Sequence, residues 1–483
     1  MSDDELLWST AVDLAARVAG KEVSAREVAE AHLRRIEAVN PTVNAVVTVT
    51  AERAMELADA ADEALARGDE IGPLHGLPAV HKDLHETAGI RTTFGSPLFA
   101  DHVPTTNAAI VQRMLDAGAI TLGKSNTPEF GAGSQTFNEV FGATLNPYDL
   151  SRTCGGSSGG AAVALATGMV ALADGSDMGG SLRNPAGFCN VVGFRPSPGR
   201  VPALPTVGGW GTLSVHGPMA RTVADVALFL TGIAGADRRS PISLPGAPSS
   251  FGRPLDRDLT GTRIAVSPRL GDLPVDPAVV RVVEAAGAVF EGLGCQVDTV
   301  DPDLGAADEV FQTLRAWQFE MGFGHQVDAR REAFKETIRW NVDRGRSLTG
   351  PDIAAAERAR TEVFLGFSDF METYDWLLVP TAQVPPFDVE TEWVSEIDGV
   401  RLDTYIDWMK ACFRITVTGH PAISVPGGFT DDGLPVGVQI VGRHLDDFGV
   451  LQAAYALEQA NPVGRTRPPG YDRYGWRRTG PLR

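Results

Sequence analysis

The chain has 483 residues, of which 43% are hydrophobic and 21% are charged, and its formal net charge at pH 7 is −19. This composition is typical of a globular protein, and the acidic charge argues against nucleic acid or an anionic membrane as a general partner. No apolar run approaches the length that spans a bilayer, and the four cysteines lie far apart without metal-ligand spacing, so we expect no membrane partner, no metal and reduced thiols.

The first part of the chain predicts helices around a single strand. Its acidic start, MSDDELLWS, lacks the basic-then-apolar pattern of a secretory signal, so we expect a cytoplasmic protein. Ser24-Ala25-Arg26-Glu27 is a capping box that begins a helix, and Asn40-Pro41 should end it. Residues 44–49 predict a strand and residues 50–67 an alanine-rich helix.

Residues 76–83, GLPAVHKD, form an apolar run that ends in a lysine. We interpret the run as a buried strand with Lys82 at its end, although lysine is more often solvated at a surface. Burial would lower the pKa of Lys82, because it disfavours the ammonium form. Asp83 should point to the opposite face, and we expect no carboxylate close enough to restore the ordinary pKa.

Residues 118–125, GAITLGKS, match the phosphate-binding pattern G-x-x-x-x-G-K-S residue for residue. That pattern requires a strand before the loop and a helix after it. Here a helix is predicted over 106–117, residues 119–122 themselves predict a strand, and Asn126-Thr127-Pro128 interrupts any following helix. We therefore reject nucleotide binding.

Residues 154–183 contain two glycine-serine clusters, 155–160 and 179–181, on either side of an apolar run. Glycine gives up more backbone freedom on folding than other residues, so such clusters favour sharp bends or a close approach to a ligand. A flexible linker has a similar composition. The apolar run, 161–172, argues for burial instead.

The rest of the chain alternates predicted strands and helices. Helices are predicted over 222–234, 277–293, most of 306–375 and 446–459, and strands over 263–267, 295–300, 376–380, 421–426 and 436–441. Such alternation predicts a single large α/β domain, with a mixed, mainly parallel sheet covered by helices on both faces.

Two hydrolase interpretations compete for the glycine-serine clusters. Gly155-x-Ser157-x-Gly159 fits the nucleophile elbow of α/β-hydrolases, which needs a strand before it and a histidine after it. The preceding segment, 146–153, is turn-like. The histidines that follow have no catalytic context and are interpreted as surface or satisfied core residues: His216, His325, His420 and His444.

The second interpretation combines Lys82, Ser157 and Ser181. A serine hydroxyl needs a base to become a nucleophile, and a lysine made neutral by burial can be that base. A second serine can pass the proton between them. Backbone amides at Gly179 and Gly180 would stabilise an oxyanion.

The motifs GLPAVHKD, GGSSGG and GSDMGGSLRNPAGFC occur in this order, and in them the chain resembles the amidase signature family of serine hydrolases. The spacing, 75 residues from Lys82 to Ser157 and 24 from Ser157 to Ser181, is family-like. Flanking segments such as GKSNTPEFGAGS and GHPAISVPGGF resemble the family too, and the likeness is weakest over 235–375. Cys154, Met178 and Asn190 depart from the common pattern.

The resemblance implies Ser181 as nucleophile, Ser157 as a bridging serine with a cis peptide bond, and Lys82 as base. It also implies an oxyanion hole made by backbone amides of Met178, Gly179, Gly180 and Ser181. We expect Asp177 and Arg183 to pair and to brace the 179–180 turn. Five residues are candidates for the substrate-binding wall: Gly131, Ala132, Gly133, Ser134 and Gln135.

The resemblance divides the chain into an N-terminal helical part (1–70), a catalytic core (71–235), a variable substrate-side region (236–375) and a C-terminal completion of the sheet (376–483). Within 306–375, Trp317, Phe319 and Phe323 supply either an apolar substrate pocket or ordinary core.

A cofactor-independent hydrolase of amide or carbamate C–N bonds is therefore expected, acting on small molecules as a monomer or homodimer. The alternatives are the amidase subunit of a glutamyl-tRNA amidotransferase, an esterase that uses Ser157, and a binding module without activity. The acidic charge and the aromatic residues of 306–375 favour a stand-alone enzyme with an apolar substrate.

Overall fold

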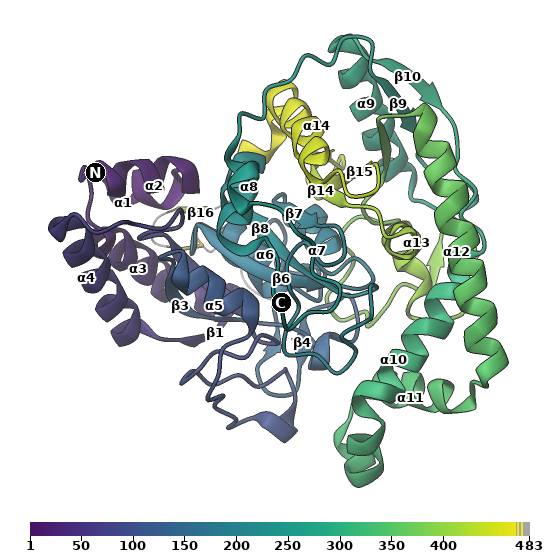
Figure 1. The fold of residues 1–483 in the computed structure, drawn as a ribbon, viewed down its shortest axis with the longest axis horizontal. Coiled ribbons are helices and arrows are strands. Elements are labelled where there is room, and N and C mark those ends of the chain that lie inside the picture. The colour runs from purple at the N-terminus through teal and green to yellow at the C-terminus, as the bar shows by residue number, and fades with distance from the viewer. Residues whose placement is uncertain (470, 473–474, 477–483) are drawn as a thin grey trace.

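The computed structural model describes residues 1–469, 471–472 and 475–476, and in it the chain folds around one mixed sheet (Figure 1). The order of its strands is β1-β3-β2-β6-β8-β7-β14-β15-β11-β9-β10. The bounds of the strands are β1 Val46–Val49, β2 Pro78–Lys82, β3 Ile120–Ser125, β6 Leu172–Asp177, β7 Val192–Arg195, β8 Val215–Ala220, β9 Arg263–Val266, β10 Gln296–Thr299, β11 Trp376–Pro380, β14 Ala422–Phe429 and β15 Pro435–Gly442.

The single α/β domain and the mixed sheet are confirmed. Parallel pairing holds in two blocks, β3-β2-β6 and β11-β9-β10, which contain the predicted strand-helix-strand units. Between and beside these blocks the strands of this sheet pair antiparallel, in six pairs against four parallel ones. Two of the antiparallel pairs are made by β8, which we did not predict, and another by the β14–β15 hairpin.

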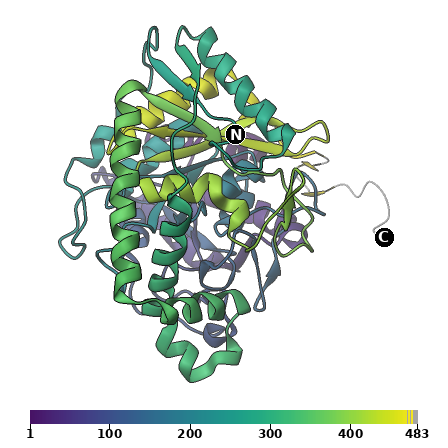
Figure 2. The same cartoon turned by 90° about the vertical axis from the view of Figure 1, so that its right-hand side faces the viewer.

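Helices pack against the sheet along its length. They are α1 Asp3–Trp8, α2 Ala11–Ala19, α3 Ala25–Val43, α4 Ala51–Arg67, α5 Ala109–Asp116, α6 Gly159–Ala166, α7 Arg183–Phe188, α8 Val223–Ile233, α9 Pro277–Gly292, α10 Ala307–Arg330, α11 Glu336–Ser347, α12 Gly350–Thr373, α13 Lys410–Thr418 and α14 Asp447–Ala460. The long helix α12 flanks the body, and α11 projects from it in both views (Figures 1 and 2). No helix among the described residues is both long and apolar enough to cross a bilayer.

The predicted end of the first long helix was wrong. The capping box at Ser24 is present, but α3 continues through Pro41 to Val43. Proline removes only one backbone N–H, and in the last turn that loss is small. The helix ends instead at Asn44, which adopts left-handed backbone angles (φ 52°) and donates its N–H to the carbonyl of Asn40 at 2.8 Å.

The rejected phosphate-binding pattern is a strand in the fold. Residues 120–125 form β3, which pairs with both β1 and β2. Lys124 is buried, and its ammonium group donates to the Thr87 hydroxyl at 2.8 Å and to the carbonyl of His85. The ammonium group of Lys124 thus forms hydrogen bonds inside the protein.

Candidate active site

Lys82 is the last residue of β2 and is fully buried. Its Nζ donates to three serine hydroxyls, those of Ser157 at 2.8 Å, Ser158 at 2.9 Å and Ser176 at 3.1 Å. The strand-end position is confirmed, and the solvated alternative is wrong. A neutral amine has only two N–H groups, so in that state one of the three hydroxyls must donate to Nζ.

Burial lowers the pKa of Lys82 to about 7, although the carboxylates of Asp177 and Asp174 raise it in part. These two carboxylates offset only part of the effect, so the expectation that no carboxylate would restore the ordinary pKa is confirmed. Desolvation still has the larger effect, so the amine is substantially neutral near pH 7. Asp83 faces a different set of groups: its carboxylate accepts from the hydroxyl of Thr93 at 2.5 Å.

Ser157 lies in the bend that precedes α6, and the peptide bond between Gly156 and Ser157 is cis, as the resemblance implied. The carbonyl of Gly156 accepts from Ser134 Oγ at 2.7 Å, which fixes the bend from the other side. Residues 154–156 are not a strand. The strand-to-helix context that a nucleophile elbow requires is therefore absent.

Ser181 lies between β6 and α7 and is partly exposed. Its carbonyl accepts from the backbone N–H of Ser158 at 3.2 Å, which ties the two glycine-serine clusters together. In the part of the chain that the structure describes, no hydrogen bond joins the hydroxyls of Ser157 and Ser181. The structure thus shows the first link of the expected relay, from Lys82 to Ser157, and not the second.

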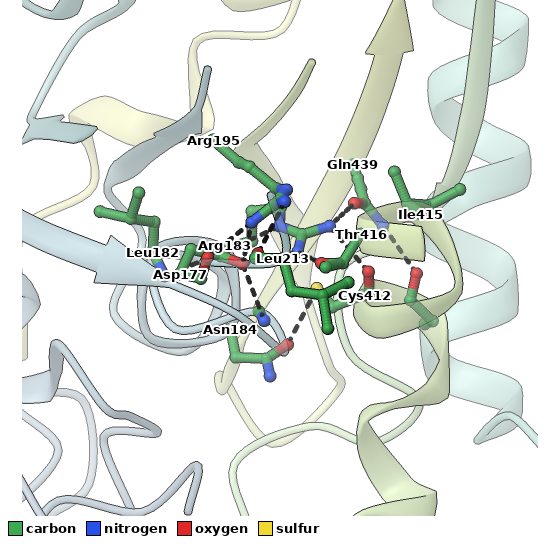
Figure 3. A network of polar contacts seen from close by, with 12 residues as sticks. Asp177, Leu182, Arg183, Asn184, Arg195, Leu213, Cys412, Ile415, Thr416 and Gln439 are labelled. Carbon is green, nitrogen blue, oxygen red and sulfur yellow. Dashed lines mark hydrogen bonds and ion pairs between the residues drawn. The ribbon is translucent and has the colours of Figure 1, made fainter. Parts of the chain in front are cut away.

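Asp177 and Arg183 form the predicted pair, with Arg183 Nη2 at 2.8 Å from Asp177 Oδ1 and Nε at 3.0 Å from Oδ2 (Figure 3). Arg195 approaches the same carboxylate at 3.2 Å, and all three side chains are fully buried. The carboxylate also accepts from the amide of Gly180 at 3.0 Å. The Gly180 amide is thus directed to Asp177, and not, as we expected, to an oxyanion.

Replacing Asp177 with asparagine should cost stability. The change keeps the shape but leaves two buried guanidinium groups without a counter-charge, and breaking such a cluster typically costs about 3–5 kcal/mol. Urea denaturation of the variant measures the loss. Asp59→Asn, in an exposed pair with Arg26, is the matched control and should leave the free energy of unfolding nearly unchanged. An equal loss in the two variants contradicts the bracing role.

The five candidate residues of the substrate-binding wall, 131–135, lie near Ser157 but differ in whether their side chains are free to contact a substrate. Gly131 is closest: a Cβ added to it would lie 3.3 Å from Ser157 Oγ. Ser134 accepts from Asn184, and Gln135 donates to the carbonyls of residues 391 and 392, so both hold the structure together. Ala132 is fully buried among apolar side chains, and Gly133 is partly exposed.

A cavity of about 740 Å³ is lined by Met178, three residues before Ser181, although Lys82, Ser157 and Ser181 are not themselves among its lining residues. Met178, Phe319 and Phe323 line it, whereas Trp317 does not and is 40% exposed. The walls of the cavity also include further aromatic rings and a few polar side chains: Phe94, Phe99, Phe130, Glu86, His102 and His216. The variable helical region therefore does contribute to a cavity, through two of the three aromatic residues that the sequence singled out.

Sequence reasoning missed a buried polar cluster behind Lys82. The carboxylate of Asp174 accepts from the backbone N–H of Lys82 at 2.9 Å and lies within 2.7 Å of the Nδ1 atoms of His81 and His85. His216 stands next to His85 and was wrongly interpreted as a surface or satisfied core residue. His81 lies within GLPAVHKD and Asp174 within 154–183, but no pattern links them to each other or to His216, and only the pairing of distant strands brings them together.

The chain is similar to known amidases over nearly its whole length. The family model described as Amidase matches residues 27–451. An acylamidase of Rhodococcus erythropolis is 37% identical over 474 residues, covering 97% of this chain and 98% of that protein. A glutamyl-tRNA(Gln) amidotransferase subunit of Moorella thermoacetica is 37% identical over 489 residues, covering 96% and 99%. A solved bacterial aryl acylamidase of the amidase signature enzymes has a TM-score of 0.88 at 31% identity, covering 95% and 99%.

Proposed function

Because the chain belongs to the amidase signature family, we propose that it hydrolyses amide C–N bonds with Ser181 as nucleophile, Lys82 as base and Ser157 as the bridge between them. The observation that carries the roles is the position of Lys82. It is buried at a strand end, within 2.8 Å of Ser157 Oγ, with a pKa lowered to about 7. A neutral amine at this place can take a proton from a hydroxyl, as the mechanism requires.

In the first half-reaction Ser181 Oγ attacks the carbonyl carbon, and its proton passes through the Ser157 hydroxyl to Lys82 Nζ. The tetrahedral intermediate then collapses as the C–N bond breaks. Lys82 returns the proton through Ser157 to the departing nitrogen, so the amine leaves neutral and an ester to Ser181 remains. Water attacks this ester by the same relay, which releases the acid and restores the serine.

The developing oxyanion lies, in this proposal, against backbone amides of Met178, Gly179 and Ser181. Amide donors aimed at the position of the developing charge are worth several kcal/mol in a site that excludes water. Asp177 draws the Gly180 amide away from that position, and with Arg183 it holds the turn. We therefore assign Gly180 to the support of the hole.

The cavity favours substrates with an apolar, aryl-sized part. Aromatic side chains form much of its wall, and its volume of about 740 Å³ lies in the range of small-molecule sites. The relative from Rhodococcus erythropolis and the solved structure are named for acylamide hydrolysis, which agrees with this preference. Carbamates present the same carbonyl geometry and remain in the proposed substrate class.

The second candidate is an amidotransferase subunit, favoured by the 37% identity to the Moorella protein. The acidic charge and the aromatic cavity support the stand-alone enzyme, working in the cytoplasm as a monomer or homodimer without nucleic acid. We also keep the four-part division of the chain as a proposal, with 236–375 on the substrate side. Residues 470, 473–474 and 477–483 of its last part lie outside the described residues.

A hydrolysis panel on the purified protein tests the proposed function. Aryl amides, primary amides, carbamates and esters are compared by kcat/KM. We expect aryl amides to be hydrolysed by the chain alone. A protein that is inert on all four classes and gains glutaminase activity only with partner subunits supports the amidotransferase alternative.

Phe323→Ala should change the order of preference within that panel. Phe323 lines the cavity and packs on Phe130, with ring centroids 4.9 Å apart, so its loss enlarges the space for an aryl group. We expect the ratio of kcat/KM for larger to smaller aryl amides to rise by about tenfold, because one or two methylene groups in an apolar pocket give discrimination of this size. Trp317→Ala, on the same helix but outside the cavity, is the control. The same uniform fall in rate in both variants contradicts the pocket role.

A further inference from the structure

Two neighbouring histidines, of which His216 lines the cavity, have buried nitrogen atoms without a partner among the described residues. His85 follows β2, His216 lies in β8, and their ring centroids are 4.3 Å apart. Within the described residues, neither His85 Nε2 nor His216 Nδ1 has a hydrogen-bond partner, although both atoms are buried. Buried polar atoms are nearly always paired in folded proteins. His216 lines the cavity, so a bound molecule can reach this pair.

Asp174 determines which nitrogen of His85 carries the proton. An ionised carboxylate only accepts hydrogen bonds, so His85 Nδ1, at 2.7 Å from Asp174 Oδ1, must be the donor. Burial lowers the pKa of His85, which favours the neutral ring. In a neutral ring the other nitrogen has a lone pair. His85 is only 2% exposed, so its Nε2 is a buried acceptor that lacks a donor among the described residues.

His216 can supply that donor. The two rings are tilted by 45° with centroids 4.3 Å apart, and they form no hydrogen bond with each other in the structure. A shift of His216 that brought its Nδ1–H to His85 Nε2 would satisfy both unpaired atoms at once. Burial lowers the pKa of His216 well below its usual value, so this ring is neutral too. With its proton on Nδ1, His216 keeps a lone pair on Nε2. In that arrangement the series of hydrogen bonds that starts at Asp174 and passes through His85 ends at an acceptor atom, His216 Nε2.

We propose that His216 Nε2 accepts a hydrogen bond from an O–H or N–H group of the substrate and so selects apolar molecules that carry such a donor. The proposal rests on the proposed function, because it takes the cavity as the substrate site. His216 lies opposite Ser176 in the β6–β8 register, and Ser176 Oγ is 3.1 Å from Lys82 Nζ. The acceptor thus lies on the strand that pairs with β6, opposite a serine that contacts Lys82.

Equilibrium binding tests the proposal without any need for turnover. The Ser181→Ala protein is titrated in a calorimeter with phenylacetanilides that carry a hydroxyl at the meta or para position of either ring, and with their fluoro counterparts. Fluorine has nearly the size of a hydroxyl but donates no hydrogen bond. We expect at least one hydroxyl compound to bind about five- to tenfold more tightly than its fluoro partner, as one hydrogen bond is worth. His216→Phe on the same background should remove the preference.

His102→Phe is the matched control, because His102 lines the same cavity but stacks on Phe94, with centroids 5.8 Å apart, away from Asp174. It should keep the preference. The proposal is overturned if no hydroxyl compound binds more tightly, if His216→Phe keeps the preference, or if His102→Phe removes it equally. His216→Leu replaces the phenylalanine variant if that one does not fold. Failure of the hydrolysis panel, by contrast, overturns the proposed function and leaves these binding ratios interpretable.

Discussion

Ser181→Ala should lower kcat on an aryl amide by a factor on the order of 10⁶ and leave the melting temperature nearly unchanged. The variant has no nucleophile, and alanine differs from serine by a single oxygen atom. The serine side chain makes no hydrogen bond among the described residues, so its removal leaves no buried partner unsatisfied. Steady-state kinetics and a thermal melt of the same preparation measure the two effects.

Ser157→Ala is the comparison that separates the two serines. It removes the bridge and one hydroxyl partner of Lys82, so its activity should also fall by several orders of magnitude. The two variants differ in covalent trapping: a carbamoylating inhibitor should label the Ser157→Ala protein slowly and Ser181→Ala not at all. Labelling of Ser181→Ala at residue 157 would instead assign the nucleophile to Ser157 and restore the esterase interpretation.

The parts of the site that could be predicted from the sequence are those that lie in local motifs. Lys82 at a strand end and the two serine clusters could be found because each motif is a continuous segment, and so could the pair of Asp177 and Arg183. The pKa of Lys82 could be predicted in direction only. Its value depends first on how completely the amine is desolvated and then on Asp177 and Asp174, which strand β6 carries and which pairing between β2 and β6 brings near Lys82.

In the fold, too, the element that depends on distant neighbours was not predicted from the sequence. β8, VHGPMA, contains glycine and proline and has too little alternation to be recognised, yet it pairs with both β6 and β7 at the centre of the sheet. A short central strand is stabilised by its neighbours more than by its own propensity. Because β8 was missed, so was the position of His216, which faces Ser176 only through that pairing.

Lys82→Met should reduce kcat by about 10²–10⁴-fold, as the loss of a general base does, and should change the shape of the pH profile. In the parent, kcat/KM should rise with pH as Lys82 loses its proton, with a midpoint near its pKa of about 7. Methionine fills a similar volume and has no proton to lose. The residual activity of the variant should therefore show no such rise between pH 6 and 8.

Lys124→Met is the matched control for the pH profile. Lys124 is a second fully buried lysine, on the neighbouring strand β3, and burial lowers its pKa to about 8. It contacts His85 and Thr87 and none of the three serines around Lys82. This variant should keep the rise in rate near pH 7. If the rise persists in Lys82→Met and disappears in Lys124→Met, Lys82 is not the base.

Stability should change in the opposite direction to activity. The unfolded chain keeps the Lys82 proton up to a pH near 10.5 and the folded protein only up to about 7, an interval that corresponds to roughly 5 kcal/mol. Between these values the unfolded state binds more protons, so the cost of burying Lys82 is full below about pH 7, shrinks as pH rises and vanishes near 10.5. Methionine removes that cost but loses hydrogen bonds to three serines, each worth ~1 kcal/mol. Lys82→Met should therefore be more stable than the parent in urea at pH 7, and its advantage should shrink, and can reverse, by pH 10. A difference in the free energy of unfolding that is constant from pH 7 to pH 10 would show that burial does not lower the pKa of Lys82.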